Sequence, residues 1–384
     1  MKSLKKLICI LSCAAIFMTI LIVCTQPTYA EDVSSAKAKM LYETQTGQVI
    51  YSQNADQKLP MASVTKTMCL LLWAEDIDAG KLSLEDKVKA SSYASSAEGS
   101  VIWLEPGEEM SAAELLEAVI VSSANDACIA LAEHSAGSEA QFVKRMNERA
   151  AELEMTNTRY TNCVGFDDSG HYSTARDIAI VTAELMKHDV YRGWLLTWLD
   201  YLRGGETQLV NTNKLIRSYN GILGGKTGTT DNAGCCLTVC AERGDMRLVA
   251  VTLGCADDDE RFSSAKELLD YGFNSFEKFT PEVDLTQIKT IPITHGVLEE
   301  TTPIIREQGA ECVIRKGRAA DVEYEYTFVE ECAAPVKKGQ FMGEYLVTLD
   351  GAEVFRSEIV CKEEIPRLNF WRCMQLIFRE IFSF

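Results

Sequence analysis

The sequence predicts an α/β chain, in which an antiparallel sheet is combined with several helices, followed by a small all-β domain and a terminal amphipathic helix. Three observations lead to this prediction. Between residues 63 and 187, apolar residues recur mainly at helical spacing. Residues 221–254 hold apolar runs joined by the turn Arg243-Gly-Asp245, as expected for antiparallel strands. After Thr280-Pro281 the apolar period changes to two, which is typical of half-buried strands.

The individual elements follow from these periodicities and from local signals at their ends. Gly47 lies in a turn between two apolar runs, so we predict a hairpin over residues 36–53. Ser111 and Glu114 form a capping box, which marks the start of a helix. The predicted helices span residues 63–73, 111–120, 126–135, 139–153, 174–187 and 258–279. The predicted strands after the hairpin span residues 221–229, 237–241, 248–254, 288–293, 322–328 and 344–349.

Length and charge limit the organisation and the partners of the chain. The 384 residues are 47% hydrophobic and 24% charged, which is enough material for two globular domains. We predict a first domain over residues 31–279, an all-β domain over 280–364 and a terminal helix over 365–384. The formal net charge is −18. A surface this acidic repels nucleic acid, so we exclude nucleic acid as a partner.

Residues 1–30 have the features of a secretory signal peptide. Three lysines precede an apolar run from Leu7 to Cys24, and Thr28-Tyr29-Ala30 places small residues where a signal peptidase cuts. We therefore expect an exported protein that is cleaved after Ala30. An uncleaved anchor is the alternative, because the run is almost long enough to span a membrane. A lipoprotein site at Cys24 is disfavoured, because Val23 stands where a small residue is needed.

The C-terminal segment, residues 365–384, is predicted to be an amphipathic helix that lies on a membrane surface. Arg372 and Arg379 prevent it from spanning, whereas an aromatic-rich stripe suits the membrane interface. The alternative is a helix that packs on the core of the protein itself. The stripe consists of Leu368, Trp371, Met374, Ile377, Phe378, Ile381 and Phe382.

Cysteine is unusually frequent, with 14 in the chain. Three precede Ala30, which leaves an odd number in the exported part, and none of the spacings is typical of a metal site. We interpret the cysteines as small buried side chains that stay reduced. Neither a metal ion nor a cofactor is expected.

One Ser-x-x-Lys segment lies at the start of an apolar, helix-forming stretch. Ser63 and Lys66 are three residues apart, so on a helix their side chains share a face. The helix N-terminus favours a serine alkoxide, and a lysine in a dry pocket releases its proton more easily. The pair can therefore act as nucleophile and general base. Alone the pattern has little weight, because it also begins at Ser3, Ser34, Ser263 and Ser275.

Two further motifs follow Ser63 in a meaningful order. Ser123-Ala-Asn125 falls between two predicted helices, where a loop can aim both side chains inward. The alternative is that these residues only cap the helix that follows. Lys226-Thr227-Gly228 lies on a predicted strand and occurs once in the chain. The order Ser-x-x-Lys, Ser-x-Asn, Lys-Thr-Gly is the motif set of penicillin-binding proteins and class A β-lactamases.

The chain resembles the low-molecular-mass penicillin-binding proteins of the serine D-alanyl-D-alanine carboxypeptidase type, from about Lys37 to the C-terminus. The resemblance implies a serine β-lactamase-like catalytic domain, whose antiparallel sheet has helices on both faces, and a location on the outer face of the bacterial cytoplasmic membrane. The motifs that carry it are Met61-Ala-Ser-Val-Thr-Lys66, Leu104-Glu-Pro-Gly107, Ser122-Ser-Ala-Asn-Asp-Ala127, His171-Tyr-Ser-Thr-Ala-Arg-Asp177 and Gly225-Lys-Thr-Gly-Thr-Thr230.

The resemblance also implies a role for each motif residue. Ser63 would be the nucleophile, Lys66 its base and Ser123 the relay that protonates the leaving amine. The main-chain N–H groups of Ser63 and Thr229 would form the oxyanion hole. Arg261 stands where the family places an arginine for the substrate carboxylate, although a surface ion pair would explain it equally well. The substrate-binding residues that the resemblance implies are Asn125, Lys226, Thr227, Gly228, Thr229 and Arg261.

Residue chemistry predicts an acyl-enzyme on Ser63, and the resemblance implies that the reaction removes the terminal D-alanine from peptidoglycan stem pentapeptides. β-Lactams would acylate the same serine as covalent inhibitors. A DD-endopeptidase or transpeptidase shares every motif, and a non-catalytic penicillin-binding wall protein is a further alternative. A class A β-lactamase is disfavoured, because no glutamate for its deacylating water occurs between Met155 and Ala183. We expect His171 and Arg176 to fix their loop and not to complete a catalytic triad.

Overall fold

The computed structural model describes residues 35–374 and residue 378. The predicted signal peptide and most of the second half of the predicted tail helix lie outside the described residues. The described chain forms two compact units. The first, which we call the catalytic unit, contains residues 35–283 and 309–320, and the second contains residues 284–308 and the described residues from 321 onward.

The catalytic unit is built on a five-stranded antiparallel sheet with the strand order β2-β1-β9-β8-β7. The predicted 36–53 hairpin is present, and the motif strand β7 is at the edge of the sheet, so one side of β7 has no partner strand within the described chain. The strands are β1 (Ala38–Glu43), β2 (Val49–Gln53), β7 (Ile222–Thr230), β8 (Gly234–Arg243) and β9 (Met246–Cys255).

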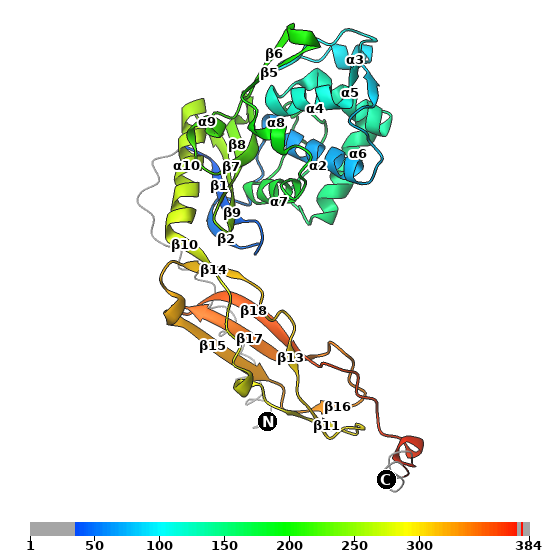
Figure 1. Cartoon of the computed structure of the whole chain (residues 1–384), viewed down its shortest axis with the longest axis vertical. Helices are drawn as coiled ribbons and strands as arrows, with labels where there is room; N and C mark the ends of the chain where they lie inside the picture. The colour runs from blue at the N-terminus through cyan, green and yellow to red at the C-terminus, as the bar shows by residue number, and fades with distance from the viewer. Residues whose placement is uncertain (1–34, 375–377, 379–384) are drawn as a thin grey trace, which may run out of the picture. The chain divides into compact units, whose positions relative to one another are not determined.

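Helices cover both faces of this sheet, as Figure 1 shows. The period of two along β9 explains why both faces are buried: Val249 and Val251 face one core, whereas Leu248 and Ala250 face the other. Helix α10 packs on one side, and α2, α4, α5, α6 and α7 belong to the core on the other. The longer helices are α2 (Lys66–Asp78), α4 (Ala112–Val121), α5 (Asn125–Ala136), α6 (Glu139–Glu152), α7 (Ala175–Leu185) and α10 (Asp258–Ser275).

Helix α4 begins at the predicted capping box. The Ser111 hydroxyl accepts from the Glu114 N–H, and the Glu114 carboxylate accepts from the Ser111 N–H at 2.9 Å. The shorter helical segments are η1 (Ala62–Thr65), α3 (Ser92–Ser95), α8 (Arg192–Leu196), η2 (Arg203–Gly205) and α9 (Leu215–Ser218). The small hairpins, which the sequence analysis missed, are β3 (Lys87–Lys89) with β4 (Glu109–Ser111) and β5 (Leu199–Leu202) with β6 (Thr207–Val210).

The predicted helix over residues 258–279 is wrong in its last turn. Helix α10 ends at Ser275, and Phe276–Phe279 is a strand, β10, that pairs antiparallel with β14 (Cys312–Arg315). The Phe276 ring packs edge-on against Tyr271 at a centroid distance of 5.3 Å. A pairing with a strand more than 30 residues away therefore overrides the local helical pattern.

The second unit is all-β within its described residues, apart from short helical turns, as the change of apolar period predicted. A four-stranded sheet has the order β13-β18-β17-β15, and a three-stranded sheet has the order β12-β11-β16. Its strands and turns are η3 (Leu285–Gln287), β11 (Ile291–Thr294), β12 (Glu300–Thr301), β13 (Ile304–Ile305), β15 (Val322–Phe328), β16 (Cys332–Ala333), β17 (Phe341–Leu349) and β18 (Ala352–Val360). The turn η4 (Ala319–Asp321) spans the boundary at which the chain passes from the catalytic unit to this unit.

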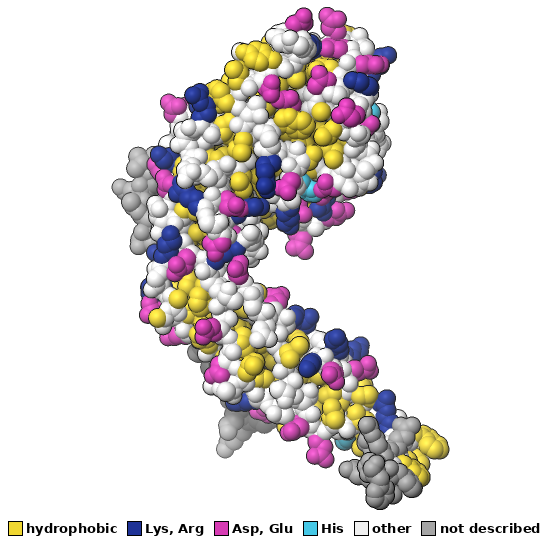
Figure 2. Space-filling model, in the orientation of Figure 1, with side chains coloured by type: hydrophobic (Ala, Val, Ile, Leu, Met, Phe, Trp, Pro, Cys, Tyr) yellow, Lys and Arg dark blue, Asp and Glu magenta, His cyan; other side chains and the backbone are white. Residues whose placement is uncertain are grey.

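The described part of the tail contains only the start of a helix. Ile365 forms a bridge with Val336, and residues 370–374 are helical. The side chains of Phe370 and Trp371 are 71% and 76% exposed, so they do not pack on a core. Within residues 35–374, no helix is both long and apolar enough to cross a membrane. Acidic and basic side chains are interspersed over the visible face of the chain (Figure 2), without a large basic patch there.

Candidate active site

The Ser63–Lys66 pair lies at the junction of η1 and α2. Ser63 is in the 3₁₀ turn, and Lys66 is the first residue of the α-helix. The two side chains share a face as predicted, and Lys66 Nζ lies 2.9 Å from Ser63 Oγ. The lysine side chain is completely buried, and this burial lowers the pKa of its amine.

Lys66 Nζ also contacts three oxygen atoms from other segments. It lies 2.6 Å from Asn125 Oδ1, 3.2 Å from the main-chain oxygen of Val164 and 3.5 Å from Ser123 Oγ. The amine is therefore held between a helix N-terminus, an interhelical turn and a loop. The fold brings the first two predicted motifs into direct contact.

Ser123 connects the two buried lysines. It lies between α4 and α5 with a φ of 61°, a conformation that a non-glycine residue rarely adopts. Lys226 Nζ donates to its hydroxyl at 2.8 Å. Burial, followed by the nearby charges of Lys66 and Arg261, lowers the pKa of the Lys226 amine. One hydroxyl thus joins the Ser-x-x-Lys and Lys-Thr-Gly motifs.

Asn125 and its neighbour fix one wall of the site. Asn125 is the first residue of α5, and its Nδ2 donates to the main-chain oxygen of Glu98 at 2.6 Å. Asp126 accepts the main-chain N–H groups of Ile102 and Leu104. Neither Ser123 nor Asn125 is the N-cap of α5, since the N-cap is Ala124 and has no side-chain hydrogen bond. The loop before Leu104 therefore borders the site, and its residues Gly99 and Ser100 line the cavity.

The edge strand β7 forms the opposite wall. Gly228 is necessary for this arrangement, because a Cβ there would lie 2.7 Å from the Ser63 nitrogen and 2.8 Å from the Met61 oxygen. Thr227 Oγ1 donates to Thr212 Oγ1 at 2.7 Å. Thr229 Oγ1 is exposed to the cavity side by side with Gly228.

Arg261 reaches this wall from α10 and is 7% exposed. Its Nη1 donates to the Gly228 oxygen at 3.1 Å and to Thr229 Oγ1 at 3.0 Å, and its Nη2 forms an ion pair with Asp258. Arg261 thus has an acidic partner and also lines the cavity, while its role toward a substrate carboxylate stays a prediction.

A cavity of about 250 Å³ opens between these two walls. Both lysines lie beneath its lining, since Lys66 is 0% and Lys226 is 2% exposed. The motif side chains that line it are Ser63, Ser123, Asn125, Thr227, Gly228, Thr229 and Arg261. Within the described chain, no cluster of three or more His, Cys, Asp or Glu side chains could hold a metal ion.

His171 is not a partner of the serine. Thr161 donates its main-chain N–H to Nδ1 at 3.1 Å, which assigns the proton to Nε2, and Nε2 lies 2.7 Å from Thr65 Oγ1. Arg176 forms an ion pair with Asp56 at 2.6 Å. The interpretation that His171 and Arg176 fix their loop is confirmed.

The sequence analysis missed the loop that contains Val164 and Gly165. The Val164 oxygen accepts from Ser63 Oγ at 3.2 Å as well as from Lys66. Thr212, which lines the cavity and holds Thr227, was also missed. Main-chain oxygens carry no residue signature, so only Gly165 could have indicated a close approach.

Comparison with solved structures defines the class of protein. Penicillin binding protein 5 from Haemophilus influenzae superposes with a TM-score of 0.78 and 27% identity, covering 88% of this chain and 100% of that one. Penicillin-binding protein D2 from Listeria monocytogenes, in its ampicillin-bound form, gives a TM-score of 0.56 and 31% identity, covering 65% of this chain and 100% of its own. The predicted fold class, that of the penicillin-binding proteins, is confirmed.

Sequence comparison then gives the family. The profile described as D-alanyl-D-alanine carboxypeptidase matches residues 25–257. The D-alanyl-D-alanine carboxypeptidase DacF of Bacillus subtilis (strain 168) is 37% identical over 348 residues, covering 89% of this chain and 88% of its own length. The chain belongs to the D-alanyl-D-alanine carboxypeptidase family of serine peptidases.

The buried neutral His171 makes a testable contribution to stability. Burial lowers its pKa to about 4 from 6.5, so between these values the unfolded chain binds the proton more strongly. The stabilisation is complete above pH 6.5 and is lost as the pH falls toward 4. The full effect is roughly 3 kcal/mol.

We expect the difference in free energy of unfolding between the parent and His171→Gln to shrink as the pH falls from 7 to 4. Glutamine can still donate to Thr65 but has no proton to gain in this range. Urea denaturation at several pH values measures the difference. A difference that stays constant with pH would contradict the assignment.

Proposed function

We propose that the protein is a serine D-Ala-D-Ala carboxypeptidase that removes the terminal D-alanine from peptidoglycan stem pentapeptides. The observation that carries the proposal is the 2.9 Å contact of Lys66 Nζ with Ser63 Oγ, at a cavity bounded by an edge strand. Relatives with this activity in their names match this chain over most of its length. The substrate class comes from those relatives, and the roles of the residues come from their chemistry.

Acylation begins with the neutral amine of Lys66. It takes the proton of Ser63 while Oγ attacks the carbonyl carbon of the penultimate D-Ala. The main-chain N–H groups of Ser63 and Thr229 donate to the developing oxyanion. The C–N bond breaks, and Ser123 passes a proton from Lys66 to the leaving D-alanine amine. Water then hydrolyses the ester and returns Ser63 to its starting state.

Charge explains how Lys66 is kept neutral. Two ammonium groups linked by the single hydroxyl of Ser123 repel each other in a buried site. A substrate carboxylate near β7 favours the charged form of Lys226, and this charge then disfavours protonation of Lys66. Arg261 and the hydroxyls of Thr227 and Thr229 complete the carboxylate site. Substrate binding and activation of the base are thus coupled electrostatically.

Two further features support this reaction. The free edge of β7 can accept the stem peptide as an added strand, and Gly228 keeps that edge close to Ser63. Asn125, which supports the cavity wall, lies where its amide can contact the substrate amide oxygen. A β-lactam presents a strained amide next to a carboxylate, so the same groups would direct it to Ser63.

Peptidoglycan is outside the cytoplasm, which agrees with an exported protein. The signal peptide over residues 1–30 remains a prediction. We also propose that the C-terminal segment binds a membrane surface. The exposed side chains Phe370, Trp371 and Phe378 support this proposal, because soluble surfaces seldom present three large aromatic rings so near one terminus.

Replacement of the nucleophile tests the reaction. The parent, without residues 1–30, should release D-alanine from a diacyl-Lys-D-Ala-D-Ala peptide and form a covalent adduct with benzylpenicillin. Ser63→Ala should lower release by about 10³-fold or more, because no acyl-enzyme forms. Free D-alanine and the intact mass of the protein are the measurements.

The two assays separate the alternatives. A parent that is acylated by penicillin but releases no D-alanine would be assayed as an endopeptidase or transpeptidase. A parent that is inert in both assays would be a non-catalytic wall protein.

Arg261 tests the carboxylate site. Arg261→Gln should lower kcat/KM for the acid peptide by about 10- to 100-fold, because a charge-assisted hydrogen bond is worth roughly 1.5–3 kcal/mol. The same peptide with a C-terminal amide should be affected little. Steady-state kinetics with both peptides gives the comparison. Equal losses for the two peptides would assign Arg261 only to supporting β7.

Membrane association is tested with vesicles that contain anionic lipid. The protein without residues 1–30 should sediment with them, and Trp371→Asp should reduce the bound fraction about tenfold or more, since a buried aromatic ring contributes roughly 1.5–3 kcal/mol. Leu285→Asp is the control, because Leu285 is 69% exposed in the same unit but far from the tail in sequence. Equal binding of the parent and Trp371→Asp would contradict the proposal.

A further inference from the structure

One main-chain oxygen contacts both reacting side chains of the site. The carbonyl oxygen of Val164 lies 3.2 Å from Lys66 Nζ and 3.2 Å from Ser63 Oγ. No substitution of Val164 removes this atom, so its direction depends on whatever holds the loop from Asn162 to Phe166. Asn162 binds one end of this loop and two thiols bind the other, and Glu139 Oε1 also accepts the main-chain N–H of Cys163 at 3.0 Å.

Asn162 binds the later part of this loop, from Val164 to Phe166. Its Oδ1 accepts three successive main-chain N–H groups, those of Val164 at 3.2 Å, Gly165 at 2.7 Å and Phe166 at 3.0 Å. Its Nδ2 donates back to the Phe166 oxygen at 3.0 Å. One side chain therefore closes the whole turn.

The turn is so tight against the nucleophile that only glycine fits at its centre. Gly165 has a φ of 92°, and a Cβ there would lie 1.9 Å from the main-chain oxygen of Ala62. The direction of the Val164 carbonyl is thus fixed by backbone geometry that Asn162 maintains.

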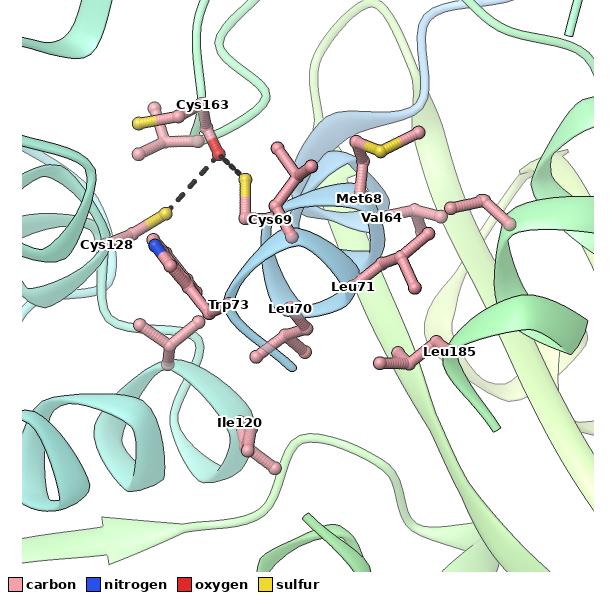
Figure 3. Close-up of a cluster of buried hydrophobic side chains, with 14 of the residues drawn as sticks. Val64, Met68, Cys69, Leu70, Leu71, Trp73, Ile120, Cys128, Cys163 and Leu185 are labelled. Atoms are coloured by element: carbon pink, nitrogen blue, oxygen red, sulfur yellow. Dashed lines mark hydrogen bonds between the residues drawn. The ribbon is translucent and has the colours of Figure 1, made fainter. Parts of the chain in front are cut away.

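Two thiols bind the loop at Cys163, the residue before Val164 (Figure 3). Cys69 Sγ donates to the Cys163 oxygen at 3.1 Å, and Cys128 Sγ donates to the same oxygen at 3.4 Å. Figure 3 shows both sulfur atoms pointing at this carbonyl from different helices.

The positions of the two thiols are informative. Cys69 follows Lys66 by three residues on α2, and Cys128 follows Asn125 by three residues on α5. Each thiol therefore shares a helix face with a polar group of the site. Helix α2, which carries Lys66, and helix α5, which carries Asn125, thus also hold the peptide group that precedes Val164.

We propose that Asn162, Cys69 and Cys128 are positioning residues that aim the Val164 carbonyl at Lys66. A neutral amine has two N–H groups and one lone pair. When Asn125 Oδ1 and the Val164 oxygen accept the two N–H groups, and the Ser63 hydroxyl turns from the Val164 oxygen to Lys66, the lone pair is left for that hydroxyl. The inference rests on the proposed function, because it assigns Lys66 as the base.

The proposal predicts a change in pH dependence as well as in rate. A carbonyl oxygen stabilises the ammonium form of Lys66 more than the amine, so a misdirected carbonyl lowers the pKa of Lys66 further. The acid limb of the pH profile of the acylation rate should then move to lower pH. The titratable groups that face Lys66 from the surrounding elements are Cys69, Asp126, Cys128, Cys163 and Lys226.

The test is acylation of the protein without residues 1–30 by benzylpenicillin, measured as a second-order rate constant across pH. We expect Asn162→Ala to lower the plateau value of this rate constant by about 30-fold or more, since small misplacements of reacting groups have effects of this size. Its acid limb should shift to lower pH. Asn147→Ala is the matched control, because Asn147 binds the N–H and oxygen of Tyr160 in the preceding segment but does not contact Val164.

The thiols are tested by paired substitutions. Cys69→Ser with Cys128→Ser keeps both donors, and its rate should stay within about threefold of the parent, whereas the corresponding alanine pair should lose about tenfold. Even if Asn162→Ala fails to fold, this comparison still tests whether the thiol hydrogen bonds to the Cys163 oxygen contribute to the acylation rate.

Each result has a defined meaning. A parent that penicillin does not acylate would overturn the proposed function itself. An acylated parent whose Asn162→Ala profile matches that of Asn147→Ala would overturn the positioning role of Asn162. Equal acylation rates for the Cys69/Cys128 double variants with serine and with alanine would overturn the positioning role of the two thiols.

Discussion

The catalytic unit depends on the burial of two lysine amines beside one hydroxyl. Lys66 and Lys226 are almost fully buried, and both lie within hydrogen-bonding reach of Ser123. Removing an amine from water disfavours its charge, and a second amine nearby disfavours it further. Burial therefore favours a neutral amine in the site, which the proposed reaction requires as its base, and in that proposal the substrate carboxylate determines which lysine carries a proton. The neighbouring walls serve this arrangement by supplying acceptors and excluding water.

Main-chain atoms provide much of that support. The Val164 oxygen contacts Lys66, and the oxygen of Glu98 orients the Asn125 amide. The oxygen of Gly228 accepts from Arg261. Loops that supply such oxygens must be held rigidly, and the hydrogen bonds that Asn162 and Asp126 accept from several main-chain N–H groups do this. The free thiols fit the same scheme, since a buried thiol can donate a hydrogen bond without introducing charge.

Local signals predicted the elements well where local interactions decide them. The capping box at Ser111 starts α4, and the strand β15 has the predicted bounds Val322–Phe328. The prediction failed at Phe276–Phe279, where pairing with β14 replaces the last turn of a helix. The hairpin β5–β6 was missed for a related reason, because its short strands alternate weakly and depend on each other for their pairing.

The sequence alone indicated the residues of the proposed site: helical spacing links Ser63 and Lys66, and motif order added Ser123, Asn125 and the strand with Lys226. Three-residue spacing on a helix fixes a distance, so this much needs no tertiary structure. Only the tertiary structure decided how the segments meet. The contacts of Ser123 with both lysines and of the Val164 oxygen with Lys66 join residues 57–103 positions apart. Main-chain oxygens are present in every residue, so no sequence pattern could show which of them faces the base.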